Sequence, residues 1–121
     1  MANLLKVHKS ELEKGVWALS LRGSVDASNI EAVVTSAGEV LEAGARHLVV
    51  DLENAEYVSS AGFSGFLRMV DQVAEKGGKI IFVSTPPKIW EIFKILGLER
   101  KLSFATDAPA ALTLLRSLPT P

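Results

Sequence analysis

Hydrophobic and polar residues alternate at the start of the chain in the pattern of β-strands. Residues 16–23 place Trp17 and Leu21 on one face of an extended chain, with smaller residues on the other. A weaker alternation that begins at Leu5 predicts an earlier strand. The two segments are separated by Glu13-Lys14-Gly15, which is typical of a turn. We therefore predict that the chain opens with a hairpin.

An amphipathic helix is predicted next. Apolar residues recur at helical spacing between Ile30 and Leu41, with polar and acidic residues between them. Ser28 is a residue type that caps helices, and Glu31 lies three positions later, which is the spacing of a capping box. Gly44 follows the stripe and predicts the end of the helix, because glycine adopts the left-handed conformation at little cost.

The most apolar strand and the next helix adjoin at the centre of the chain. Residues 46–52 contain the run Leu48-Val49-Val50, which indicates a strand buried on both faces. We predict a turn over the polar residues that follow, and then a helix over residues 63–74 that Gly77-Gly78 ends. The predicted inner side of this helix consists of Phe63, Phe66, Leu67, Val70, Val73 and Ala74.

The last third of the chain repeats the alternation of strand and helix. Residues 79–84 predict a buried strand, and Pro86-Pro87 opens a third helix. A short extended piece over residues 102–104 precedes a final helix that residues 106–109 cap. The predicted inner stripe of the third helix is Ile89, Ile92, Phe93 and Leu96, with Gly97 as its stop.

This order predicts an α/β fold. Strands that alternate with helices form right-handed crossovers and a mostly parallel sheet, which the opening hairpin makes mixed. We expect a single domain over residues 1–121, with a core from about residue 5 to 115. Its sheet should have four or five strands, with the helices mainly on one face.

Composition excludes several classes of function. The chain has 121 residues, 48% of them hydrophobic, and a net charge of -1, so it is globular and nucleic acid is not an expected partner. It has no cysteine, and His8 and His47 are far apart, so neither a disulfide nor a metal site is predicted. No apolar run approaches the roughly 20 residues that span a bilayer, and the start is no signal peptide. We expect a cytoplasmic protein without a cofactor.

Ser59-Ser60-Ala61-Gly62 is the stretch most able to carry chemistry. It follows a buried strand and opens a helix, so it should lie at the carboxyl edge of the sheet, where α/β folds place their sites. The helix start would stabilise a phosphate on a serine hydroxyl, and the small residues after it leave room for a second protein. From the residues alone, however, a role as helix caps and nothing more is the commoner one for such serines.

An enzymatic interpretation of this stretch fails in detail. Residues 62–66 place Phe66 where a G-x-S-x-G hydrolase motif needs glycine, and no histidine follows in the chain. No glycine-rich loop ends in Lys-Ser or Lys-Thr, so a P-loop is absent as well. Asp51 is a lone carboxylate at a strand end and is expected to be structural. We therefore predict no enzyme activity.

Two other residues have two interpretations each. Asp26 either bonds its own loop and helix end or contributes to the site around the serines. Trp90 falls off the predicted inner stripe of the third helix, so it either anchors a partner or covers the seam between helix and sheet.

Five stretches together resemble the successive landmarks of the STAS domain, a family that includes the bacterial anti-sigma factor antagonists. The resemblance covers nearly the whole chain. The stretches are Arg22-Gly23-Ser24-Val25-Asp26, Leu48-Val49-Val50-Asp51-Leu52, Tyr57-Val58-Ser59-Ser60-Ala61-Gly62-Phe63, Gly77-Gly78-Lys79-Ile80 and Ile95-Leu96-Gly97-Leu98.

This resemblance implies a phosphorylation switch. Ser60 matches the serine that an anti-sigma factor serine kinase phosphorylates in the family. Ser59 stands where the family usually has aspartate, which leaves it as an alternative acceptor, and Phe63 replaces a leucine. Asp26 matches an acidic residue near the phosphorylated serine. The implied partner-binding residues are Asp26, Ser59, Ser60, Ala61, Gly62, Phe63 and Ser64.

The resemblance also implies a function and an alternative. An unmodified antagonist binds the kinase-like anti-sigma factor, which then releases its sigma factor, and a phosphatase would reset the switch. The alternative is a STAS subunit or scaffold of another regulatory or transporter assembly, without phosphorylation. A third class, nucleotide binding or hydrolysis at the same helix end, lacks a supporting motif.

Overall fold

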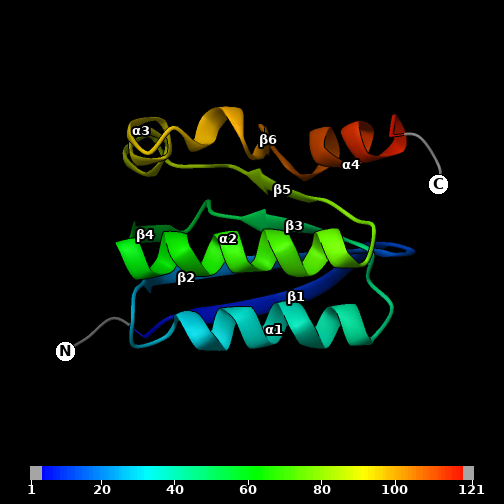
Figure 1. The fold of residues 1–121 in the computed structure, drawn as a ribbon, viewed down its shortest axis with the longest axis horizontal. Helices are drawn as coiled ribbons and strands as arrows, with labels where there is room; N and C mark the ends of the chain where they lie inside the picture. Colours follow the sequence, from blue (N-terminus) through cyan, green and yellow to red (C-terminus); the bar gives the residue numbers. More distant parts are fainter. Residues whose placement is uncertain (1–3, 119–121) are drawn as a thin grey trace.

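A computed structural model describes residues 4–118 as one mixed sheet with four α-helices packed on it (Figure 1). The sheet has six strands in the order β1-β2-β3-β5-β6, with β4 paired to β2 beside this path. The elements are β1 (Lys6–Glu13), β2 (Val16–Val25), α1 (Ile30–Glu42), β3 (His47–Asp51), β4 (Ala55–Val58), α2 (Ser60–Glu75), β5 (Ile80–Val83), α3 (Pro87–Ile95), a 3-10 turn (Leu98–Arg100), β6 (Ser103–Ala105) and α4 (Ala108–Arg116).

The predicted α/β fold is confirmed. β1 and β2 form the expected antiparallel hairpin, whereas every other pair of strands is parallel. Parallel pairing brings the carboxyl ends of β2 to β6 to one edge of the sheet, which lies toward the left of Figure 1. The sixth strand is β4, which falls within the stretch predicted as a turn. Three of its four residues pair with the end of β2, and Glu56 falls at a register shift.

Helices α1, α2 and α3 cover one face of the sheet, and α4 covers part of the other (Figure 1). The helices thus lie mainly on one face, as predicted. The larger core lies between the first three helices and strand residues such as Leu19 and Leu21. The smaller core joins Ala111 and Leu115 of α4 to the opposite face, with Val49 at its centre. β3 is therefore buried on both sides, as its continuous apolar run predicts.

The inner faces of two helices differ from the prediction. On α2, Met69 is fully buried, while Leu67 is 39% exposed and Ala74 is also exposed. On α3, Leu96 lies just after the last helical residue and is 52% exposed. Both corrections have the same cause. Several apolar residues on a helix compete for one stripe, and the position of the helix over the sheet decides which of them turn inward.

Candidate functional site at the start of helix α2

Ser59 is the N-cap of α2. Its backbone is extended, and its hydroxyl oxygen accepts a hydrogen bond from the N–H of Gly62 at 3.3 Å. Its own N–H donates to the carbonyl oxygen of Val25 at 2.8 Å, and its carbonyl oxygen accepts from the N–H of Phe63 at 3.0 Å. Ser59 therefore fixes where the helix begins, which is the capping role that the sequence left open.

Ser60 is the first residue of α2, and its side chain is exposed. Within residues 4–118 its hydroxyl has no hydrogen-bond partner. The first intrahelical bond closes at Phe63 and the Ser59 cap takes the N–H of Gly62. The N–H groups of Ser60 and Ala61 are thus left as unused donors at the positive end of the helix. The first turn contains no acidic residue that would neutralise this end.

The residues after Ser60 hold this turn against the core. Gly62 is buried so closely that an added Cβ would lie 2.7 Å from Cγ1 of Val58. Phe63 is 4% exposed, and its ring packs edge-on against Phe93 with centroids 4.9 Å apart. Gly62 and Phe63 of the implied partner-binding set therefore face inward and support the surface. Ala61 is half-buried, and Ser64 is exposed.

Asp26 lies beside the serines through strand pairing. Val25 of β2 is paired with Val58 of β4, so Asp26 and Ser59 follow directly after paired residues. The Asp26 carboxylate accepts hydrogen bonds from the hydroxyl and the N–H of Ser28. These bonds lower the pKa of Asp26 because they stabilise its charged form, and the bond from the Ser28 hydroxyl has the largest effect. Asp26 thus bonds its own loop and also puts a fixed negative charge beside the start of α2.

The predicted capping box of α1 is wrong. The cap position is held by Asn29, which makes no side-chain cap bond. Ser28 instead donates its hydroxyl to Asp26, and the side chain of Asn29 bridges the loop by accepting from the Asp26 N–H and donating to the Ser24 carbonyl. The polar side chains of residues 24–29 therefore stabilise the loop between β2 and α1 rather than the start of α1.

An exposed stripe runs along α2 from Ser60 through Ser64 and Leu67 to Arg68. The Arg68 guanidinium pairs with the Glu31 carboxylate of α1, and this hydrogen bond lowers the pKa of Glu31. Tyr57 on β4, two residues before Ser59, is 54% exposed. Sequence reasoning missed Tyr57 and Leu67 as surface residues, because Leu67 matches the apolar stripe of the helix and Tyr57 lies in a stretch predicted as a turn.

The family profile of the STAS domain matches residues 9–111. This chain belongs to the STAS domain family. BtrV of Bordetella bronchiseptica, a candidate anti-sigma factor antagonist, is 28% identical over 97 residues, which cover 80% of this chain and 84% of BtrV.

Solved STAS structures share the fold. An anti-sigma factor antagonist from Mycobacterium paratuberculosis superposes with a TM-score of 0.82 at 21% identity, covering 94% of this chain and 96% of the other. The phosphorylated form of the Bacillus cell fate determinant SpoIIAA superposes with a TM-score of 0.71 at 15% identity, covering 90% and 99%. At these identities the superpositions show that this STAS domain has the fold of anti-sigma factor antagonists.

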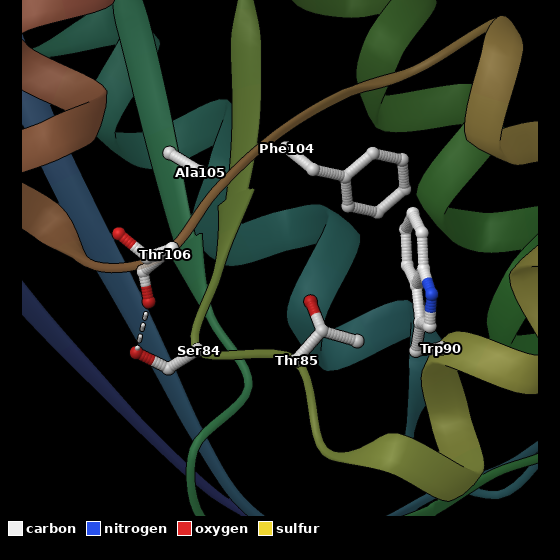
Figure 2. Close-up of a pocket in the computed structure, with 6 residues that line it drawn as sticks. All are labelled: Ser84, Thr85, Trp90, Phe104, Ala105 and Thr106. Carbon is white, nitrogen blue, oxygen red and sulfur yellow. Dashed lines mark hydrogen bonds between the residues drawn. The ribbon is translucent and has the colours of Figure 1, made fainter.

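Trp90 of this STAS domain packs on β6. Its half-buried ring stands edge-to-face with Phe104, with centroids 4.9 Å apart, as the seam interpretation predicts. The two rings line a cavity of about 460 Å³ at the carboxyl ends of β5 and β6 (Figure 2). Ser84 and Thr106 also line this cavity, and Ser84 donates its hydroxyl to the carbonyl oxygen of Thr106. Trp90 therefore joins α3 to the edge of the sheet.

The histidines of this STAS domain lie apart from the site. His47 begins β3, and its Nδ1 accepts from the N–H of Lys79 at 3.0 Å. Partial burial, followed by the charge of Arg46, lowers the pKa of His47. His8 lies inside β1. In residues 4–118 no three His, Asp or Glu side chains gather to hold a metal ion, and no helix there has the length and hydrophobicity to cross a membrane.

The two serines should differ in their effect on stability. Ser59→Ala is expected to lower the free energy of unfolding by about 0.5–2 kcal/mol, because it leaves the Gly62 N–H at the helix start without its acceptor. Ser60→Ala should change it by less than about 0.5 kcal/mol, because its exposed hydroxyl supports no contact. Urea denaturation followed by circular dichroism measures both. An equal loss in the two variants would contradict the assignment of Ser59 as the cap.

Proposed function

We propose that this protein is an anti-sigma factor antagonist that changes partners when Ser60 is phosphorylated. The observation that carries the proposal is the division of roles between the two serines. Ser59 takes the structural bond at the helix start, and Ser60 keeps an exposed, unpaired hydroxyl at the same positive end. The likeness to BtrV, named as a candidate antagonist, supports the regulatory class. The fold shared with phosphorylated SpoIIAA is compatible with this switch.

The chemistry at Ser60 requires an external kinase with ATP. The Ser60 oxygen attacks the γ-phosphorus, the bond to the oxygen of the leaving ADP breaks, and the hydroxyl proton passes to a base of the kinase. The product is a phosphoserine with about -1.5 to -2 charges at neutral pH. The unused N–H groups of Ser60 and Ala61 would stabilise this charge in the free protein. Asp26 supplies no such help, because it is negative itself.

Ser59 is the less favourable acceptor. Ser59 is half-buried, and its hydroxyl oxygen already accepts a hydrogen bond from the N–H of Gly62. Phosphorylation of Ser59 would therefore disrupt the N-cap of α2 in the free protein. The partner surface of the unmodified protein consists of polar Ser60 and Ser64, apolar Leu67 and aromatic Tyr57, with Asp26 at its rim. An exposed tyrosine and leucine beside small polar groups are suited to anchoring a protein partner.

The proposal implies a setting as well as a partner. The partner is an anti-sigma factor serine kinase that releases its sigma factor when this protein binds, and a phosphatase would restore the unmodified state. All of these steps use cytoplasmic components. The protein itself contributes a surface and a phosphate acceptor and catalyses no reaction.

Phosphate mapping tests the proposal. The protein is incubated with ATP and the anti-sigma factor kinases encoded in the same genome, and the modified residue is located by mass spectrometry. One phosphate on Ser60 is expected, absent from Ser60→Ala and retained in Ser59→Ala. Labelling that persists in Ser60→Ala and disappears in Ser59→Ala would overturn the choice of acceptor. A bound kinase that leaves both serines unmodified would instead support the alternative of a STAS scaffold without phosphorylation.

A further inference from the structure

A second cavity lies on the face of the sheet opposite α1 and α2. Its volume is about 320 Å³, and its lining residues come from three strands and from the turn after β3; all are polar or charged except Leu21. Strand register brings them together. His8, Ser20 and Asp51 form one row across β1, β2 and β3, and Lys6 stands directly opposite Arg22 in the neighbouring row. Asn54, from the turn after β3, also lines the cavity.

This cavity is uncovered because α4 packs on another part of the same face of the sheet. That helix covers its face of the sheet through the small core around Val16, Ala18 and Val49. In Figure 1 it lies toward the end of the sheet where the β1–β2 hairpin turns, while β1 begins toward the other end. No helix in residues 4–118 is packed over the rows that contain Lys6 and His8, which are both exposed.

The charges of this cavity are unbalanced. Lys6 and Arg22 are cross-strand neighbours on one face, an arrangement of like charges that destabilises a sheet. The ion pairs within residues 4–118 use other cations, so neither residue has an internal carboxylate partner. Asp51 is the one acid in the lining, and one of its carboxylate oxygens accepts the N–H of Glu53. An anion from solution would relieve the repulsion.

We propose that this cavity binds a small phosphate monoester that also carries hydroxyl groups, such as a sugar phosphate. The planar guanidinium of Arg22 offers a pair of parallel N–H donors to phosphate oxygens, and the Lys6 ammonium adds a second charge. The free oxygen of Asp51, the Ser20 hydroxyl and the Asn54 amide suit the hydroxyl groups of such a ligand. The inference does not rest on the proposed function, because this face is opposite the one that α2 covers.

Titration of the full chain with three probes tests this inference. Glucose 6-phosphate, inorganic phosphate and glucose are added separately, and binding is followed by calorimetry and by amide shifts in NMR spectra. Glucose 6-phosphate should bind most tightly, inorganic phosphate more weakly, and glucose without detectable heat. Shifts should centre on β1, β2 and residues 51–54. Equal affinity for inorganic phosphate and the ester would overturn the role given to the hydroxyl groups.

Variants separate a built site from general charge attraction. Lys6→Ala and Arg22→Gln are each expected to weaken ester binding about tenfold or more, because each removes one phosphate contact. Lys88→Ala, which removes an exposed cation of α3, is the matched control and should leave affinity unchanged. Asp51→Asn retains an oxygen for the Glu53 turn but weakens the preference for the ester over phosphate. No binding, or equal losses in all three cation variants, would overturn the inference. Thermal unfolding of each variant verifies that it is folded.

Discussion

The protein phosphorylated on Ser60 should bind its anti-sigma factor partner hundreds- to thousands-fold more weakly than the unmodified protein. A dianionic group buried in an interface without a matching cation costs several kcal/mol, and about 1.4 kcal/mol corresponds to a tenfold change in affinity. Ser60 shares the exposed stripe of α2 with Ser64 and Leu67, so a partner that covers this stripe must cover the phosphate as well. This expectation rests on the proposed function.

The measurement compares dissociation constants of the unmodified protein, the purified phosphoprotein and two variants. Ser60→Asp introduces one negative charge and should lose part of the affinity, while Ser60→Asn, of nearly the same size, should lose much less. The thermal midpoint of the phosphoprotein should stay close to that of the unmodified protein, because the helix start stabilises the phosphate. Equal affinity of both forms for the partner would exclude an electrostatic switch at this site.

Phe82→Ala should lower the free energy of unfolding by about 3–5 kcal/mol, the range for truncating a buried phenylalanine. Phe82 is fully buried in β5, an interior strand between β3 and β6. Its ring centroid lies 5.4 Å from that of Phe66, 5.5 Å from Phe93 and 5.7 Å from Phe104. One ring thus joins α2, α3 and β6, and its loss leaves a cavity that rigid neighbours fill poorly. This loss is a large part of the roughly 5–15 kcal/mol typical of a domain.

Urea denaturation monitored by circular dichroism tests this prediction. Tyr57→Ala removes a ring that is 54% exposed and should cost less than about 1 kcal/mol, so it serves as the matched control. Phe82→Leu keeps most of the apolar volume and should fall between the wild type and Phe82→Ala, which preserves the test if the alanine variant does not fold. A similar small loss for Phe82→Ala and Tyr57→Ala would show that the aromatic cluster is not the centre of the core.

The strand that sequence reasoning missed illustrates the limit of short patterns. In β4, Ala55 and Val58 face inward while Glu56 and Tyr57 are exposed, so the alternation of a strand is absent over these four residues. The chain is extended there because it pairs with the distant end of β2 through Gly23, Ser24 and Val25. Such pairing depends on a distant partner, which local composition does not report.

The site was predictable in location but not in its division of roles. Two adjacent serines before a helix both satisfy the sequence preference for a cap. A cap requires an extended backbone one residue before the first helical turn, and the structure gives this position to Ser59. Similarly, Leu67 and Met69 are both plausible core residues, and the position of α2 over the sheet turned Met69 inward.

The sequence by itself determined the periodic features of this protein: the hairpin, the buried strand of residues 48–50, the order of strands and helices apart from β4, and a serine at a helix start. These features follow from interactions between residues close in the chain, which spacing records directly. The tertiary structure alone decided which residues from distant segments meet. Strand register set Asp26 beside Ser59 and Lys6 opposite Arg22, and such pairings leave no local trace because their free energy comes from contacts between segments.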